Sequence, residues 1–170
     1  MARKSSSDRE FEKVSLFVFQ DHKVEGKVLL ELNNQENDRA VAIVGAAFLQ
    51  TVLLSVVQEH LRGDKSTFEK IFNPGKPVGD FGVQAELAYL LSLCDRSMRD
   101  DFLTIGRIRN WFAHKLNVDR FDMSLVLQEC NKLKNVLPST VMGEQPTTPR
   151  GQFIWCIATI SGKLRMGPDW

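Results

Sequence analysis

The chain has 170 residues, 43% of them hydrophobic and 25% charged, and its 22 Lys and Arg residues nearly balance 21 Asp and Glu residues. A chain of this length can bury about two-thirds of its unfolded surface, so it needs no disulfide or metal to fold, and one domain, 1–170, is expected. The formal net charge of +1 excludes a broad basic face that would hold DNA or an anionic membrane non-specifically. Any polyanionic partner must therefore be bound at a confined site.

The three cysteines, Cys94, Cys130 and Cys156, are widely spaced and odd in number. They form no Cys-x-x-Cys pair and have no nearby run of histidines, so neither a metal site nor a disulfide framework is expected. Their apolar surroundings indicate core thiols in a reducing compartment, which predicts a cytoplasmic protein. Acidic residues follow the short polar N-terminus before any apolar stretch of signal-peptide length, so no secretion signal is predicted.

Residues 1–27 are predicted to hold an N-terminal helix and a turn, because Phe11, Val14, Phe17 and Val18 have helical spacing. A second short apolar run begins at residue 28, so this region is either two modest helices or one helix broken near Gly26. Residues 28–137 are expected to form the helical core.

The most apolar stretch of that core runs from Asp38 to about Leu61 and begins with an Asn/Asp cap candidate. It is apolar nearly all round, which predicts a helix buried on most of its faces. Residues 40–57 just reach the length of a membrane span, but Gln50 and Ser55 near the middle favour a soluble core. We therefore expect no membrane association.

The connector that follows is rich in charge, Gly and Pro. Its Gly75-Lys76-Pro77 does not fit a phosphate-binding loop, because no strand precedes it and Pro replaces the Ser/Thr that should follow the Lys. No cofactor-binding motif is therefore predicted.

Three further helices are predicted in the second half of the chain, at 81–94, 97–114 and 122–137, followed by a proline-rich linker at 138–150 and a C-terminal helix at 151–166. The last segment is β-branched, but a helix is preferred because no second strand exists to pair with it. The inward residues expected for the first of these helices are Val83, Leu87, Leu90, Leu91 and Cys94. The fold class is thus all-α, a compact bundle of about six to seven helices.

One segment, residues 106–114, departs from this apolar pattern. On an ideal helix Arg109 falls inside the apolar stripe of Met98, Phe102, Ile105 and Phe112, which predicts that it faces the interior or a partner. Asn110 and His114 share a neighbouring face with Arg107. His114 is about 140° from Arg109 on the helical projection, so the two converge only if the helix end deviates, the Arg bends round, or a second copy supplies the complement.

Arg, Asn and His together can act on a phosphodiester without a metal. His transfers a proton near neutral pH, Arg holds the phosphate and Asn orients either one, while RNA supplies its own 2′-hydroxyl nucleophile. The alternative is structural: Arg109 is neutralised by Asp38 or Glu86, Asn110 caps the helix end, and His114 favours the negative end of the helix dipole.

Several segments resemble the MltR-like (mannitol operon repressor) family, within or close to the HEPN superfamily. The matching segments are Asn37-Asp38-Arg39 before the alanine-rich helix, residues 77–81 and 87–90, Ile108-Arg109-Asn110-x-Phe112-Ala113-His114, and Pro149-Arg150-x-x-Phe153. The phrase from Arg109 to His114 is similar to the Arg-x-x-x-x-His motif of HEPN proteins.

The resemblance implies a HEPN-like bundle that forms a homodimer. Many HEPN proteins are metal-independent endoribonucleases, which are toxins or defence effectors, and their Arg and His act at a composite dimer site; here these are Arg109 and His114, with Asn110 beside the Arg. The MltR-like branch is described instead as transcriptional repressors without a recognisable DNA-reading element. This sequence likewise contains no helix-turn-helix with a basic recognition helix, so direct specific DNA binding is not expected.

Three functional hypotheses result. The first is a cytoplasmic regulatory protein of MltR type that acts through a protein partner. The alternative is a HEPN-type endoribonuclease that binds RNA and uses Arg109, Asn110 and His114. In the third, Asp38, Arg39 and Arg109 form a buried polar network that fixes the helix register.

Overall fold

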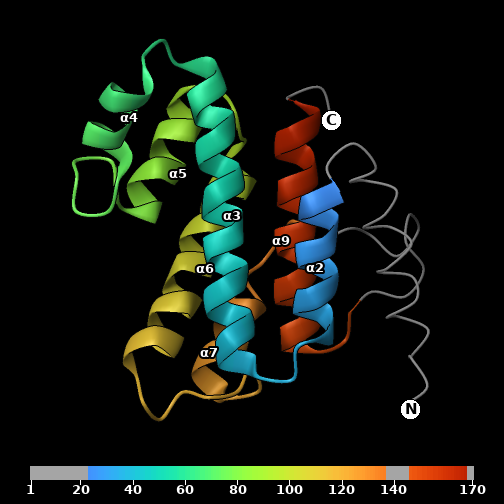
Figure 1. Ribbon diagram of the computed structural model, residues 1–170. Helices are drawn as coiled ribbons and strands as arrows, with labels where there is room; N and C mark the ends of the chain where they lie inside the picture. The colour runs from blue at the N-terminus through green and yellow to red at the C-terminus, as the bar shows by residue number, and fades with distance from the viewer. Residues whose placement is uncertain (1–22, 137–145, 168–170) are drawn as a thin grey trace.

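The computed structural model describes residues 23–136 and 146–167. Its elements are α2 (Lys23–Asn34), α3 (Asp38–His60), α4 (Lys65–Phe72), α5 (Phe81–Leu90), α6 (Arg96–His114), α7 (Ser124–Cys130) and α9 (Pro149–Met166), shown in Figure 1. The described residues contain no strand, so the predicted all-α class is confirmed. The helix expected around Phe11, Val14, Phe17 and Val18, and residues 138–145 of the expected linker, lie outside the described residues.

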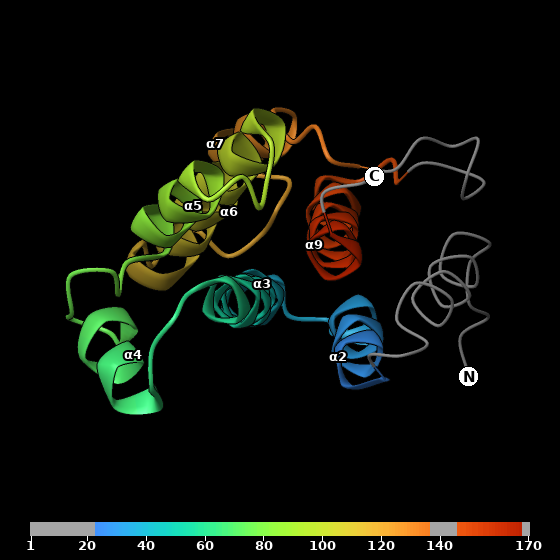
Figure 2. The ribbon, with the colours of Figure 1, turned by 90° about the horizontal axis from the view of Figure 1, so that it is seen from above.

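Helix α3 is the centre of the bundle and lies between the α5–α6 pair and the α2–α9 pair (Figure 2). The side chain of Asn37 caps it by accepting a hydrogen bond from the Ala40 amide at 3.0 Å. Gly45 permits the close approach of α9, because a Cβ there would lie 2.9 Å from Cδ1 of Ile157. Among the described helices α3 alone is long and apolar enough to cross a membrane, and 50% of its most apolar window is buried in the bundle.

Helix α6 begins after Asp95, whose carboxylate accepts a hydrogen bond from the Met98 amide at 2.7 Å. Near its other end a row of aromatic rings crosses to α9. The ring centroids of Phe112 and Phe121 are 4.9 Å apart, and those of Phe121 and Phe153 are 5.1 Å apart. This row fixes the end of α6 that carries the Arg109 to His114 segment.

The connector after α3 forms α4 and a loop that folds back on it. The Val78 amide donates a hydrogen bond to the Ile71 carbonyl at 2.8 Å. The next residue, Gly79, lies too close to the backbone of the loop to carry a side chain. A Cβ at Gly79 would lie 2.3 Å from the carbonyl oxygen of Asn73, so any larger residue would push the loop apart. The loop is thereby held beside the start of α5.

Helix α5 differs from the prediction in length and in orientation. It ends at Leu90 rather than residue 94, and the chain reverses at Ser92, whose φ of 58° is left-handed. The inward assignment of Val83 and Leu90 is wrong, because these side chains are 44% and 77% exposed. The buried residues of α5 are Gln84, Ala85 and Ala88. The two alanines on this face allow α5 to lie close against α6 and α3.

Helix α7 is shorter than the predicted 122–137. It ends at Cys130, and the chain then turns so that the backbone amides of Lys134 and Asn135 donate to the buried carboxylate of Asp101 at 2.8–3.1 Å. If the helix continued, these amides would donate to carbonyls of the helix itself, and the buried carboxylate of Asp101 would lose these hydrogen bonds.

The remaining boundaries differ less. Helix α2 runs through Gly26 without interruption, so the alternative of one helix broken there is wrong. Helix α9 is a helix, as preferred over a strand, and it begins at Pro149, two residues earlier than expected. Thr148 caps it by accepting from the Gly151 amide at 3.0 Å, and Pro suits the first helical turn because its missing amide hydrogen has no helical partner there.

Candidate functional site

Arg109 and Asn110 lie together on the exposed side of α6. Nη1 of Arg109 donates a hydrogen bond to Oδ1 of Asn110 at 2.9 Å, and both residues are exposed. They line a groove of about 350 Å³ between α3, α5, α6 and the loop before α5. Among the described residues no carboxylate lies within ion-pair distance of Arg109, so the structural alternative in which Asp38 or Glu86 neutralises it is not observed.

The position of Arg109 differs from the helical projection for a simple reason. The buried side of α6 also includes Asp101, Thr104 and Ile108, which lie on the opposite edge of the predicted apolar stripe. Including them moves the centre of the buried face about 60° away from Arg109. Arg109 therefore lies at the border between the core and the groove, not in the core.

The groove combines apolar walls with a few polar groups. Its walls include Ala46, Ala47, Phe81, Phe102 and Leu103. Next to it, Nε2 of Gln50 donates to Oε1 of the buried Gln84 at 2.8 Å, and Nε2 of Gln84 donates to the Val78 carbonyl at 2.8 Å. These two amides tie α3, α5 and the loop into one rigid edge. Sequence reasoning missed Gln84, because a glutamine in an apolar helix gives no sign of its distant partners.

His114 is the last residue of α6 and is exposed, but it does not line the groove. Five residues of helix separate it from Arg109 by about 7.5 Å along the axis and about 140° around it. A single chain therefore does not bring Arg109 and His114 into one cleft. Asn110 does not cap the helix end, since the capping residue is Lys115.

Arg39 holds the end of α6 and the loop after it. Its guanidinium donates to the carbonyl of Phe112, and its Nη2 donates to the carbonyls of Val118 at 2.7 Å, Leu116 at 3.3 Å and Lys115 at 3.4 Å. A cation at this place satisfies carbonyls that have no helical partner and favours the negative end of the helix dipole.

Asp38 connects three distant segments. Its Oδ2 accepts from the Phe121 amide at 3.0 Å, and its Oδ1 accepts from Nη1 of Arg150 at 3.1 Å. Arg150 also donates to the carbonyls of Leu32 and Glu36, both at 3.4 Å. Asp38, Arg39 and Arg150 thus join α2, α3, the end of α6 and α9, but Arg109 is not part of this network.

Arg107 lines the same groove as Asn110, as the shared face predicted, but its guanidinium is held by α7 and by its own helix. It pairs with the buried Glu129 of α7 at 2.9 Å and donates to Oγ1 of Thr104 at the same distance. Burial raises the pKa of Glu129, but hydrogen bonds from Lys132 and Arg107, together with the charges of both, outweigh burial and hold the net pKa below its ordinary value.

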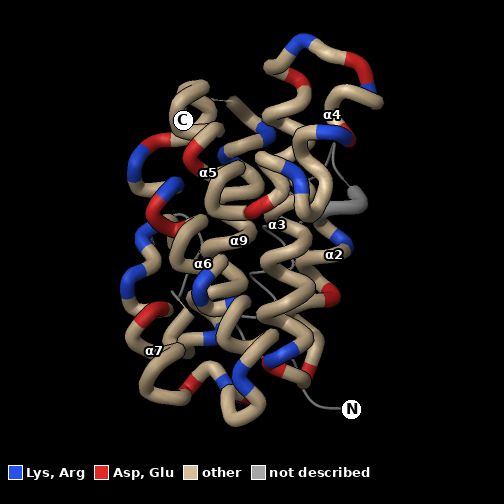
Figure 3. The backbone as a smooth tube through the Cα atoms, turned by 90° about the vertical axis from the view of Figure 1, so that its left-hand side faces the viewer, with Lys and Arg blue, Asp and Glu red and all other residues tan. Residues whose placement is uncertain are grey.

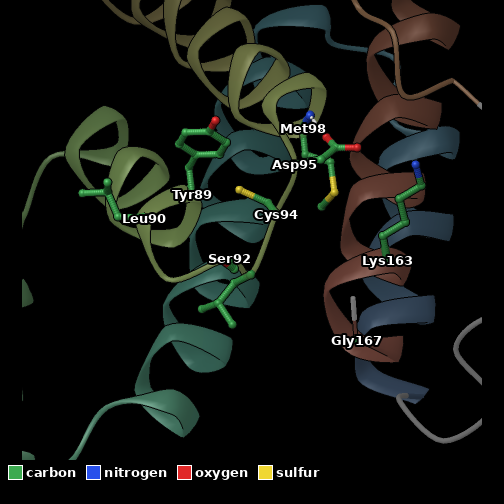
Figure 4. A pocket seen from close by; sticks show the side chains of 9 residues that line it. Tyr89, Leu90, Ser92, Cys94, Asp95, Met98, Lys163 and Gly167 are labelled. Atoms are coloured by element: carbon green, nitrogen blue, oxygen red, sulfur yellow. Dashed lines mark hydrogen bonds between the residues drawn. The ribbon is translucent and has the colours of Figure 1, made fainter. Parts of the chain in front are cut away.

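A second cavity, of about 500 Å³, was not predicted. It lies between the α5–α6 turn and the end of α9, and Figure 4 shows Asp95 and Met98 on one side with Lys163 and Gly167 on the other. Ser92, the left-handed residue, is on its rim. The two sides come from segments about 70 residues apart in the sequence, so no local signal could have indicated it. Within residues 23–136 and 146–167 no cluster of three or more His, Cys, Asp or Glu side chains could hold a metal ion.

No protein-family model matches the chain, and no curated protein matches it at a significant level. Solved structures do share its fold. MtlR of Escherichia coli, in the MtlR–HPr complex, superposes with a TM-score of 0.66 at 19% identity over 82% of this chain and 97% of that chain. YggD of Shigella flexneri 2a str. 2457T, a possible transcriptional regulator, superposes with a TM-score of 0.60 at 12% identity over 84% of this chain and 96% of that chain.

At these identities the likeness establishes the fold. The chain therefore has an MltR-like fold, in agreement with the segments that resemble this family in the sequence. The network of Asp38, Arg39 and Arg150 accounts for two of those segments, because it is built from Asn37-Asp38-Arg39 and Pro149-Arg150.

Proposed function

We propose that the chain is a cytoplasmic regulatory protein of the MltR-like family that acts by binding a protein partner. The observation that carries the proposal is the fold shared over nearly the whole length of MtlR, a protein solved in complex with HPr. The second structural neighbour, a possible transcriptional regulator, supports a regulatory role. HPr of the source organism is therefore the first partner to test.

The surface of the chain supports a protein partner better than DNA. Charges of both signs are mixed along its elements, and on the side that Figure 3 draws the Lys and Arg positions are interspersed with Asp and Glu positions. Binding to the phosphates of a duplex requires several Lys and Arg side chains on one surface. A groove whose walls include Phe81 and Phe102 and whose edge carries Arg107 and Arg109 is instead typical of the contacts between folded proteins, in which aromatic residues and Arg are enriched.

Affinity capture from a cytoplasmic extract, together with transcript measurements in a deletion strain, tests this proposal. We expect the full chain to retain HPr or another regulatory protein, and we expect the deletion to change the expression of a transport operon. Absence of any retained protein together with unchanged expression would contradict the proposal.

A second candidate function is a HEPN-type, metal-independent endoribonuclease. The observation that favours it is the exposure of Arg109, Asn110 and His114, with Arg109 oriented by Asn110. In this proposal a homodimer supplies His114 from one copy to Arg109 of the other, because one chain does not bring them together. His114 takes the proton of the 2′-hydroxyl as the 2′-oxygen attacks phosphorus, and Arg109 holds the phosphate. The P–O5′ bond breaks to leave a 2′,3′-cyclic phosphate, and the 5′-oxygen takes a proton from water.

Incubation of RNA with the purified chain in chelator tests the ribonuclease proposal. We expect cleavage by the unaltered chain, and we expect His114→Ala to abolish it. His60→Ala is the matched control, since His60 is also an exposed histidine at the end of a helix and its Nδ1 lies 2.8 Å from the Val56 carbonyl oxygen. No cleavage by the unaltered chain, or equal cleavage by all three proteins, rejects the enzyme.

A further inference from the structure

Helix α3 presents a row of uncharged residues to solvent. Val44 is 49% exposed, Ala47 and Thr51 are exposed, and Phe48 and Leu54 are half-buried beside them. Their spacing of three and four residues places all five on one side of the helix, which we call the α3 face. No Lys, Arg, Asp or Glu occurs between Arg39 and Glu59, so this face is free of charge along its whole length.

The α3 face is uncovered by the described parts of the chain. Seen from above, α2 and α4 flank α3 while α6 and α9 lie behind it, and none of these helices crosses in front (Figure 2). A helix that is apolar nearly all round would normally be buried nearly all round. The exposed side of α3 is therefore suited to contact with another molecule.

The α3 face is continuous with the groove that contains Arg109. Ala47 belongs to both, and Ala46 and Gln50 of α3 line the groove opposite Arg109 and Asn110 of α6. Arg109 is the cation at this edge without an acidic neighbour among the described residues. Asp80, the acidic residue that lines the groove, already accepts hydrogen bonds from the Gly82 and Val83 amides at 2.8 and 3.2 Å.

We propose that the α3 face and Arg109 together form the docking surface for the protein partner, which places an apolar side chain on α3 and a carboxylate against Arg109. This inference rests on the proposed regulatory function. Charge complementarity favours a different protein over a second copy of this chain. Two copies packed through the same face would offer each Arg109 no carboxylate from that face, because no Asp or Glu occurs on α3 between Arg39 and Glu59.

Titration calorimetry of the full chain with HPr tests the surface. We expect Ala47→Glu and Arg109→Glu each to weaken binding by about tenfold or more, because one buries a charge in the apolar contact and the other reverses the complementary charge. Leu90→Glu and Arg96→Glu are the matched controls, since both side chains are exposed at the far end of α5 and α6. These controls should bind within about twofold of the unaltered chain. Circular dichroism checks folding, and Thr51→Lys replaces Ala47→Glu if that variant does not fold.

The outcomes separate the two proposals. If the unaltered chain binds HPr but the α3-face variants bind equally well, or the controls weaken binding as much, the docking surface is wrong and the proposed function stands. If the unaltered chain does not bind HPr, the α3 face is rejected as a docking surface for HPr, while the proposed regulatory function is decided separately by the affinity capture and the transcript measurements. Sedimentation analysis covers the remaining case: a dimer that Ala47→Glu converts to a monomer identifies the α3 face as an interface between copies and overturns the inference.

Discussion

Arg150 donates a hydrogen bond from Nη1 to Oδ1 of Asp38 at 3.1 Å, across 112 positions of the sequence. The side chains are only 24% and 19% exposed, so the pair is shielded from water far more than an ordinary surface ion pair. It joins the first turns of α9 and α3, the pair of helices that pack most extensively against each other.

A double-mutant cycle between Asp38→Asn and Arg150→Met should show a coupling of about 1 kcal/mol in the free energy of unfolding, because each variant removes the same ion pair. The cycle between Asp38→Asn and Arg109→Met is the control. It should show coupling below about 0.5 kcal/mol, since Arg109 lies outside the network. Urea unfolding measures both, and the reverse ranking would contradict the observed pairing.

Replacement of Arg39 by Met should lower the free energy of unfolding by about 1–3 kcal/mol, because it leaves carbonyls at the end of α6 without a donor. Arg39→Lys should recover only part of the loss, since an ammonium cannot reach several carbonyls in one plane. Arg120→Met is the control, as the Arg120 side chain is 68% exposed and pairs only with surface carboxylates among the described residues. Equal urea midpoints for the Met variants at both positions would show that Arg39 does not hold the helix end.

The ion pair of Glu129 should make stability depend on pH. Its pKa is lower in the folded chain than its ordinary value of 4.5, so the folded state favours the charged form. The ion pair therefore contributes its full stabilisation above pH 4.5. This stabilisation is lost as the pH falls from 4.5 through the lower pKa of Glu129 in the folded chain. The difference in unfolding free energy between the unaltered chain and Glu129→Gln should therefore shrink as the pH falls through this range. A difference in unfolding free energy that stays constant over this pH range would contradict the role of the Glu129 ion pair. The control is Glu69→Gln, because Glu69 lies at an exposed site.

All three cysteines are free and buried, so the expectation that they are core thiols is confirmed. Burial raises the pKa of Cys94 and of Cys130 to about 12, and it raises that of Cys156 well above its ordinary value. Thiolates are the reactive form, so none of the three should react with iodoacetamide at mildly alkaline pH until the chain unfolds. Mass spectrometry with and without urea measures this, and rapid labelling of any cysteine in the native chain would contradict its burial.

The sequence predicted the parts of the fold whose signals are local. Asn37 and Asp95 cap α3 and α6 through contacts within three residues, so α3 begins where expected and α6 begins one residue earlier than expected. The ends of α5 and α7 are set instead by distant residues. The chain leaves the helix after Cys130 because backbone amides beyond it donate to the buried carboxylate of Asp101. In α5, packing against α3 and α6 buries the side that carries Ala85 and Ala88 and leaves its larger apolar residues on the outside.

The candidate site was predictable only in part. The sequence singled out Arg109, Asn110 and His114 because they interrupt an apolar pattern, and the structure places all three on the surface of α6. The sequence could not indicate that Arg109 faces the groove and not the core, because its orientation depends on the burial of Asp101, Thr104 and Ile108. The groove itself is formed by α3, α5 and α6 together, so its Gln50–Gln84 contact had no signal in any one segment.

The most direct test of the central claim is the binding of HPr from the source organism to the full chain, measured by calorimetry with purified proteins. We expect saturable binding at a single site that Ala47→Glu and Arg109→Glu weaken and Leu90→Glu does not. No heat of binding and no co-elution at any concentration would contradict the claim that this chain acts by binding that partner.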